Sequence, residues 1–84
     1  MDVCKGGTVP PGTTSITFIN HHPEACAITG CHMPGWPAVN PVIPAEQNGV
    51  PGTATIQLAA IVRPGSYPYL ASCCPNARPV IIVQ

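Results

Sequence analysis

Charged side chains are scarce in this sequence, which has three basic and three acidic residues among 84 and no net charge. Lys5, Arg63 and Arg78 are scattered along the chain. A protein that binds nucleic acid needs clustered cations to displace counterions from the phosphates, so we expect no nucleic-acid partner. The low charge and the 45% hydrophobic content also exclude a charge-rich disordered tail.

Long hydrophobic runs are missing as well. The longest uninterrupted run covers only residues 58–62, whereas a transmembrane helix needs about 20 apolar residues. Proline and glycine interrupt nearly every window in which an apolar 3.6-residue period could form. In the exception, residues 54–62, strand alternation explains the pattern equally well. The sequence therefore predicts no transmembrane segment and no helix beyond a single turn.

Groups suited to catalysis are few. The acidic residues Asp2, Glu24 and Glu46 are isolated from one another. A cysteine nucleophile with a histidine base would have to use thiols that we expect to be oxidised. We therefore predict that the protein is not an enzyme.

Proline and glycine are abundant, with 12 and 8 residues, and their pairs mark turns between segments of strand length. Residues 14–20 and 54–60 each alternate between apolar and polar side chains, which is the period of a half-buried strand. The side chains that we expect to face the core from these two strands are Ile16, Phe18, Ile56, Leu58 and Ala60.

The last two strand candidates differ from that pattern. Residues 66–70 contain Pro68, which cannot donate to a ladder and so indicates an edge position or a bulge. Residues 80–83 are a continuous apolar run, which favours a strand covered on both faces. Residues 7–9 and 26–29 are shorter candidates.

Several short strands separated by turns are typical of a small β-sandwich or barrel, and we expect a single domain over residues 1–84. The segment from about 30 to 52 is the exception, because its prolines predict a long ordered loop that crosses the sandwich. The side chains that we expect to anchor this loop are Trp36, Val39, Val42 and Ile43.

Five cysteines are present in a chain whose small size limits its core. Small domains of this kind are commonly stabilised by disulfides or a metal, and the composition favours an exported protein, extracellular or periplasmic. Residues 1–5 lack the apolar segment of a signal peptide, so we expect a leader to have been removed, with a cytosolic protein whose thiols are reduced as the alternative. The disulfide candidates are Cys4, Cys26, Cys31, Cys73 and Cys74.

The odd number of cysteines leaves at least one thiol free, bonded to another molecule or bound to a metal. Cys73 and Cys74 are adjacent, and a bridge between them would need a strained ring, so each should reach a different cysteine. Cys26 and Cys31 are the obvious partners with Cys4 left over, although Cys4 could equally pair and leave another cysteine free.

Two stretches carry a resemblance to a known family. Residues 11–23 place Pro-Gly before an alternating strand that ends in Asn20 and two histidines. Residues 64–70 read Pro-Gly-Ser-Tyr-Pro-Tyr-Leu, and the chain ends in an apolar strand at 79–83. These segments resemble the framework strands of cupredoxins, the small blue-copper β-sandwich proteins. The resemblance implies a Greek-key β-sandwich or barrel of cupredoxin-like type.

The resemblance also implies where copper ligands would lie. The first histidine ligand would fall at Cys26 and the second near Cys74. The cysteine ligand would fall at Ala71, and no methionine follows Met33 to serve as the axial ligand. A blue-copper centre needs two imidazoles and a thiolate. Electron transfer by the usual ligands is therefore the least favoured function.

Under the same resemblance, the two loops that would hold copper bring Cys26 close to Cys73 or Cys74. One interpretation is a disulfide that joins the loops in place of the metal. The other is a soft-metal site for copper or zinc, for which thiolate and imidazole are suitable donors. The candidate ligands of that site are Cys26, Cys31, His32, Met33, Cys73 and Cys74.

His21 and His22 precede Pro23 at a predicted strand end, so we expect solvated side chains on an exposed loop, with a weak accessory metal site as the alternative. The function that we predict is a non-enzymatic exported module, stapled by cysteines, with a structural or partner-binding role. A carrier of copper or zinc is the alternative. The uncharged surface favours a protein partner or self-assembly.

Overall fold

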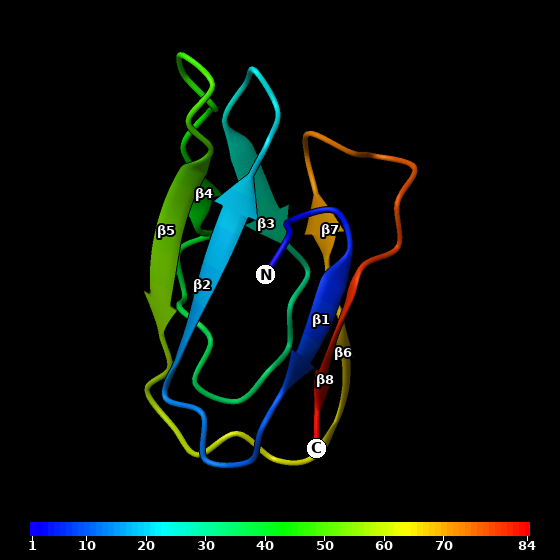
Figure 1. The fold of residues 1–84 in the computed structure, drawn as a ribbon. Coiled ribbons are helices and arrows are strands. Elements are labelled where there is room, and N and C mark those ends of the chain that lie inside the picture. Colours follow the sequence, from blue (N-terminus) through cyan, green and yellow to red (C-terminus); the bar gives the residue numbers. More distant parts are fainter.

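The structure, a computed structural model that describes residues 1–84, is built from eight short strands and contains no helix (Figure 1). The strands are β1 (Gly6–Val9), β2 (Ser15–Asn20), β3 (Cys26–Thr29), β4 (Val42–Ile43), β5 (Gly52–Gln57), β6 (Gly65–Pro68), β7 (Leu70–Ala71) and β8 (Val80–Val83). The prediction of an all-β fold is confirmed. No element is a helix with the length and hydrophobicity to cross a membrane.

The strands form three small sheets. In the first, β8 lies between β1, its parallel neighbour, and β6, which runs antiparallel to it. In the second, β2 pairs with β5, and in the third, β3 lies between β4 and β7. The N-terminal residues connect the first two sheets, because Asp2 forms bridges both to Ile19 of β2 and to Gly6 of β1.

The alternating pattern predicts β2 and most of β5 correctly. Ile16 and Phe18 of β2 are buried together with Ile56 of β5. The prediction that the second strand extends to Ala60, with the Ala60 side chain facing the core, is wrong. The ladder ends at the first residue of β2, so β5 has no partner beyond that point. Leu58 is consequently only half-buried, and Ala60 is exposed.

The chain crosses between two sheets within residues 66–70. Pro68 lies at a sheet edge, because β6 has β8 as its only ladder partner. Beyond it the chain turns, and β7 pairs with β3 instead. Tyr69 at this crossing is buried, and its ring packs edge-on against Phe18 with centroids 5.8 Å apart. Its hydroxyl donates a hydrogen bond of 2.9 Å to the Val3 carbonyl, which ties the crossing to the N-terminal segment.

The expectation that residues 80–83 are covered on both faces is wrong. Ile81 and Val83 are buried, whereas Ile82 between them is 44% exposed. The run is apolar throughout, but β8 has one face on the core and one face toward solvent. A continuous apolar run therefore does not show how many faces of a strand are covered.

The long Pro-rich loop at 30–52 is anchored by three apolar side chains. Ile43 of β4 is fully buried, and Trp36 packs edge-on against Phe18 with centroids 6.1 Å apart. Met33 is the third anchor, which the sequence pattern does not reveal. Phe18 thus lies between the rings of Trp36 and Tyr69 in a core of 13 buried residues.

Two expected anchors of this loop face solvent instead. Val39 is 80% exposed and Val42 is 57% exposed. Neighbouring side chains in a strand point to opposite faces, so Val42 faces outward when Ile43 faces the core. Hydrophobicity alone did not distinguish the two positions.

Candidate functional site

Two disulfides join three segments of the chain. Cys4 is bonded to Cys74 and Cys26 to Cys73, with Cα atoms 5.9 Å and 5.1 Å apart. Cys31 is the free cysteine. Of the pairings that the sequence leaves open, the structure has the one in which Cys4 is bonded. The other bridge joins Cys26 to one of the two adjacent cysteines.

The Cys26–Cys73 bridge follows from the pairing of β3 with β7. Just after β7, the Ser72 hydroxyl accepts a hydrogen bond of 2.9 Å from the Ala27 amide, and the Ser72 amide donates one of 3.0 Å to the Ala27 carbonyl. These bonds place Cys73 beside Cys26, and the Cys73 amide donates to the Cys26 sulfur at 3.4 Å. Cys26 is fully buried, so this bridge belongs to the core.

The Cys4–Cys74 bridge connects two turns instead. Asp2 forms the first turn: its carboxylate accepts a hydrogen bond of 2.8 Å from the Cys4 amide, and its carbonyl accepts one of 3.0 Å from the Gly6 amide. The second turn is closed by the Cys74 amide, which donates to the Ala71 carbonyl at 3.2 Å. Cys4 and Cys74 are both half-buried, so solvent reaches this bridge.

The two bridges lie against each other. The Cys73 sulfur is 4.0 Å from the Cys4 sulfur and 4.0 Å from the Cys74 sulfur. The sulfur atoms of Cys4, Cys73 and Cys74 lie within 4.8 Å of one another, and no other three His, Cys, Asp or Glu side chains come as close. We call these three residues the sulfur cluster. In the disulfide form its atoms are not thiolates, which are the form that binds metal.

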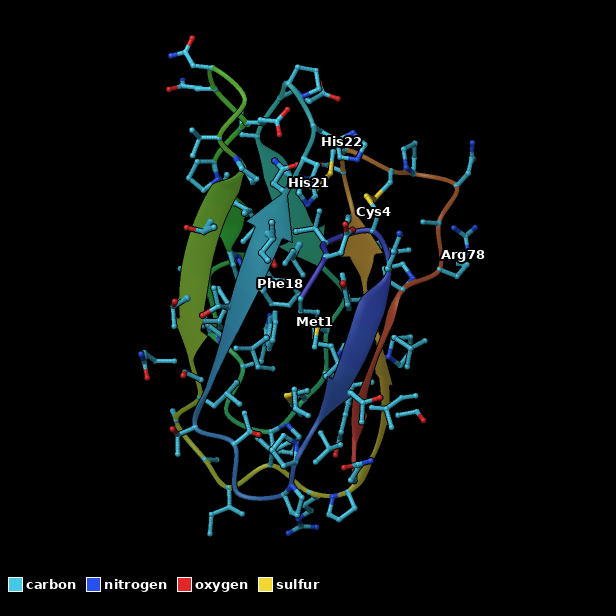
Figure 2. The ribbon with its side chains drawn as sticks, in the orientation of Figure 1. Met1, Cys4, Phe18, His21, His22 and Arg78 are labelled. Carbon is cyan, nitrogen blue, oxygen red and sulfur yellow. A yellow bond between two sulfur atoms is a disulfide. The ribbon has the colours of Figure 1, made fainter.

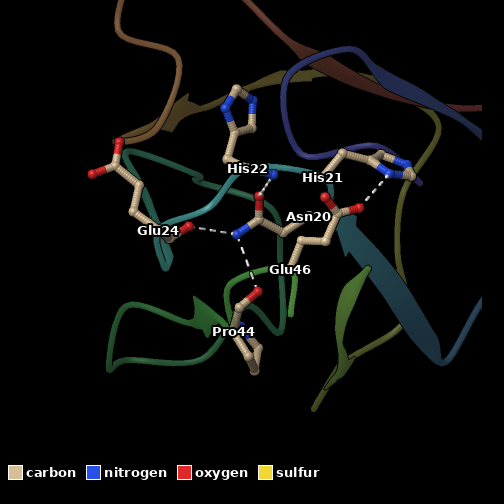
Figure 3. A network of polar contacts seen from close by, with 6 residues as sticks. All are labelled: Asn20, His21, His22, Glu24, Pro44 and Glu46. Carbon is tan, nitrogen blue, oxygen red and sulfur yellow. Dashed lines mark hydrogen bonds and ion pairs between the residues drawn. The ribbon is translucent and has the colours of Figure 1, made fainter. Parts of the chain in front are cut away.

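His22 lies beside the sulfur cluster, with its Nε2 atom 3.2 Å from the Cys4 sulfur (Figure 2). Its backbone is held from both sides, because its amide donates to the Asn20 side chain at 2.9 Å and its carbonyl accepts from the Glu46 amide at 2.9 Å. The neighbouring His21 is exposed, and its Nδ1 atom lies 3.8 Å from the Glu46 carboxylate (Figure 3). The expectation of two solvated histidines therefore does not hold for His22.

Asn20 organises the turn that carries His22. Its side chain is fully buried, and its amide nitrogen donates to the carbonyls of Glu24 at 2.9 Å and Pro44 at 3.1 Å (Figure 3). A buried side-chain amide is costly unless its polar atoms are paired. Here the partners tie the β2–β3 turn to the end of β4. The sequence marks Asn20 only as the end of an alternating strand.

The predicted metal ligands fall into two groups in the structure. Three of them are the bonded cysteines described above. Of the other three, Cys31 and His32 belong to no cluster of His, Cys, Asp or Glu side chains. Met33 is buried in the core, and His32 is exposed. Cys31 is a half-buried free thiol whose pKa is raised by burial.

Cys4 and His22 are the side chains at this end that the predicted ligand set omits. Tertiary contacts alone bring them together, since 18 positions separate them in the sequence. The only local signal is that His22 follows a strand-ending asparagine, whose side chain can accept a hydrogen bond from the amide two residues on.

The residues present do not fit a blue-copper centre. The resemblance assigns histidines to the positions of Cys26 and Cys74, both of which are bonded cysteines, and assigns the thiolate to Ala71. Comparison of the chain with known protein families, with curated proteins and with solved structures finds no match.

Proposed function

We propose that this protein is an exported, non-enzymatic module of cupredoxin-like type that serves as a structural or partner-binding unit. In this proposal, disulfides take the place of a metal as the connection between the loops at one end. One observation carries it: two bridges in mutual contact join the N-terminal turn, the start of β3 and the turn after β7. Disulfides persist in the extracellular space and the periplasm, which supports export to one of these compartments.

The expected energetic weight of the bridges supports a structural role. On the chain-entropy relation, one bridge that closes a sequence separation of 47 stabilises the fold by roughly 4 kcal/mol. Small domains have a total free energy of unfolding of only about 5–15 kcal/mol. The core of 13 buried residues is small, so much of the stability depends on the bridges.

The surface supports a partner-binding role. Six charged residues provide little electrostatic repulsion between molecules. Six large apolar side chains are also exposed, and they are available for contact with a protein partner or with a second copy of the chain. The most exposed of these side chains are Val39, Val42, Val50 and Ile61.

Thiol counting combined with sedimentation tests this proposal. We expect alkylation of the unfolded, unreduced protein to modify Cys31 alone, and alkylation after reduction to modify all five cysteines. More than one alkylated thiol before reduction, together with stoichiometric copper or zinc, would replace the structural role with that of a metal carrier. Sedimentation velocity over a concentration series then tests self-assembly: a mass that rises with concentration supports it, and a constant monomer mass excludes it.

A further inference from the structure

The sulfur cluster has the spacing of a metal site as well as that of two disulfides. In a tetrahedral zinc centre the Zn–S distance is about 2.3 Å, which places neighbouring sulfur ligands about 3.8 Å apart. The Cys73 sulfur lies 4.0 Å from the sulfurs of both Cys4 and Cys74. Of the three sulfur–sulfur distances, only the one between Cys4 and Cys74 is too short for a metal site, because these two sulfurs are bonded to each other. Reduction of their bridge allows them to separate.

An imidazole stands next to this group. The distance of 3.2 Å between His22 Nε2 and the Cys4 sulfur is close to the value of about 3.6 Å expected between nitrogen and sulfur ligands of one zinc ion. The His22 imidazole is not one of the three groups that lie within 4.8 Å of one another, so it reaches the site through a side-chain rotation. Its backbone is already fixed by Asn20 and Glu46, which limits the cost of ordering it.

From this geometry we infer that the reduced protein binds one zinc ion through Cys4, Cys73, Cys74 and His22. A dithiol reductant converts each disulfide to two thiols and is itself oxidised to a cyclic disulfide, so two dithiols are consumed per chain. Binding then releases three protons to solvent as the three thiols become thiolates. The redox state of the cysteines therefore controls metal binding: the oxidised protein is cross-linked by two disulfides, and the reduced protein binds the ion.

Cys26 is excluded from this ligand set by its position. It is fully buried in the core at the start of β3, whereas the members of the sulfur cluster are half-buried. Its sulfur is bonded to Cys73 and does not belong to the group within 4.8 Å. Three thiolates and one imidazole make a Cys₃His set, which is a common composition of structural zinc sites. This inference goes beyond the proposed structural role, which concerns the oxidised protein.

The test compares two adjacent histidines in protein that carries Cys31→Ser, which removes the thiol outside both bridges. The reduced protein is titrated under nitrogen with Co²⁺, whose charge-transfer absorption reports the thiolates, and then with Zn²⁺ in competition. We expect one ion per chain. Loss of a partner that only orients a ligand weakens metal affinity by about 10–100-fold, so His22→Ala should weaken it at least that much. His21→Ala, the matched control, should leave the affinity unchanged.

Two further variants locate the ligands. Cys4→Ser should abolish tight binding, whereas Cys26→Ala should retain it. The inference is overturned if the reduced protein binds no ion, if His21→Ala and His22→Ala behave alike, or if Cys26→Ala loses binding as Cys4→Ser does. Equal effects of the two histidine variants would also reveal non-specific binding by an unfolded reduced chain. None of these results depends on whether the oxidised protein has a partner, so failure here leaves the proposed function intact.

Discussion

The two disulfides differ in their surroundings, although both end at adjacent residues. Cys26–Cys73 joins β3 to the turn that follows its partner strand β7 and has one end fully buried in the core. Cys4–Cys74 joins two turns, is half-buried at both ends and lies against an imidazole. The comparison indicates a division of roles: the first bridge holds the sheets together, and the second is the one that solvent and reductant reach from both ends.

Removal of each bridge in turn tests this division and should give the largest effect. The chain-entropy relation alone makes the bridge with sequence separation 70 stronger than the one with 47, by about 0.4 kcal/mol. Burial of Cys26 favours the Cys26–Cys73 bridge instead, and its contribution to the free energy of unfolding is larger, about 1 kcal/mol or above. We therefore expect the Cys26→Ala/Cys73→Ala double variant to lose about 4–5 kcal/mol, and Cys4→Ala/Cys74→Ala about 3–4 kcal/mol.

Urea denaturation monitored by Trp36 fluorescence measures both values. Cys31→Ala, which breaks no bridge, is the control and should change the free energy of unfolding by less than about 1 kcal/mol. If the Cys4→Ala/Cys74→Ala variant is the less stable of the two, loop length outweighs burial and the division of roles is wrong.

Asn20 supports the surroundings of the half-buried Cys4–Cys74 bridge, and its replacement should have the next largest effect. Asn20→Ala leaves the carbonyls of Glu24 and Pro44 and the amide of His22 without their buried partner. We expect a loss of about 2–3 kcal/mol in the free energy of unfolding. Thr17→Ala, which removes the exposed hydroxyl pair with Thr55, should cost well under about 1 kcal/mol. Similar losses in both variants would contradict an organising role of Asn20.

Partial reduction sharpens the comparison without any mutation. A brief exposure to a dithiol, followed by alkylation and peptide mapping, should label Cys4 and Cys74 faster than Cys26 and Cys73. Attack on a disulfide requires access to a sulfur, and both ends of the Cys4–Cys74 bridge are half-buried, whereas the Cys26 end of the other is fully buried. Equal rates for the two bridges would show that the whole end opens together rather than one bridge at a time.

Tyr69 connects the strand crossing to the segment that carries Cys4, and its replacement should have the smallest effect. Burial and the nearby Asp2 carboxylate raise the pKa of the Tyr69 hydroxyl. A raised pKa means that the folded state favours the protonated form, so stability is lost as pH rises above the unfolded value of about 10. Tyr69→Phe removes the hydrogen bond to Val3 and should cost about 1 kcal/mol at pH 7.

The pH dependence provides the check on Tyr69. The free energy of unfolding of the original protein should fall between about pH 10 and pH 12, and the fall should be smaller in Tyr69→Phe. Tyr67→Phe, which removes the exposed bond to the Arg63 carbonyl, is the control and should keep the full alkaline decline. The same decline in all three proteins would exclude Tyr69 as its source.

Local signals were sufficient for much of the fold. Alternating polarity predicted β2 and placed Ile16 and Phe18 in the core, and the missing N–H of Pro68 predicted an edge. Contacts between segments that are distant in the sequence have no such local signal and were not predicted. Neither the exposure of Ile82 within a continuous apolar run nor the use of Met33 as an anchor has a local signature.

The sequence by itself determined that the fold is all-β. For the cysteine-rich end, it determined that one of the five cysteines has no intramolecular disulfide partner and that the two adjacent cysteines are bonded to different partners. These conclusions rest on backbone periodicity and on ring geometry, which act over a few residues. Only the tertiary structure decided that Cys4 is bonded, that Cys31 is free, and that His22 rather than His32 lies beside the sulfurs. Which distant side chains meet depends on how the sheets pack and how the turns are tied, and no short stretch of sequence contains that information.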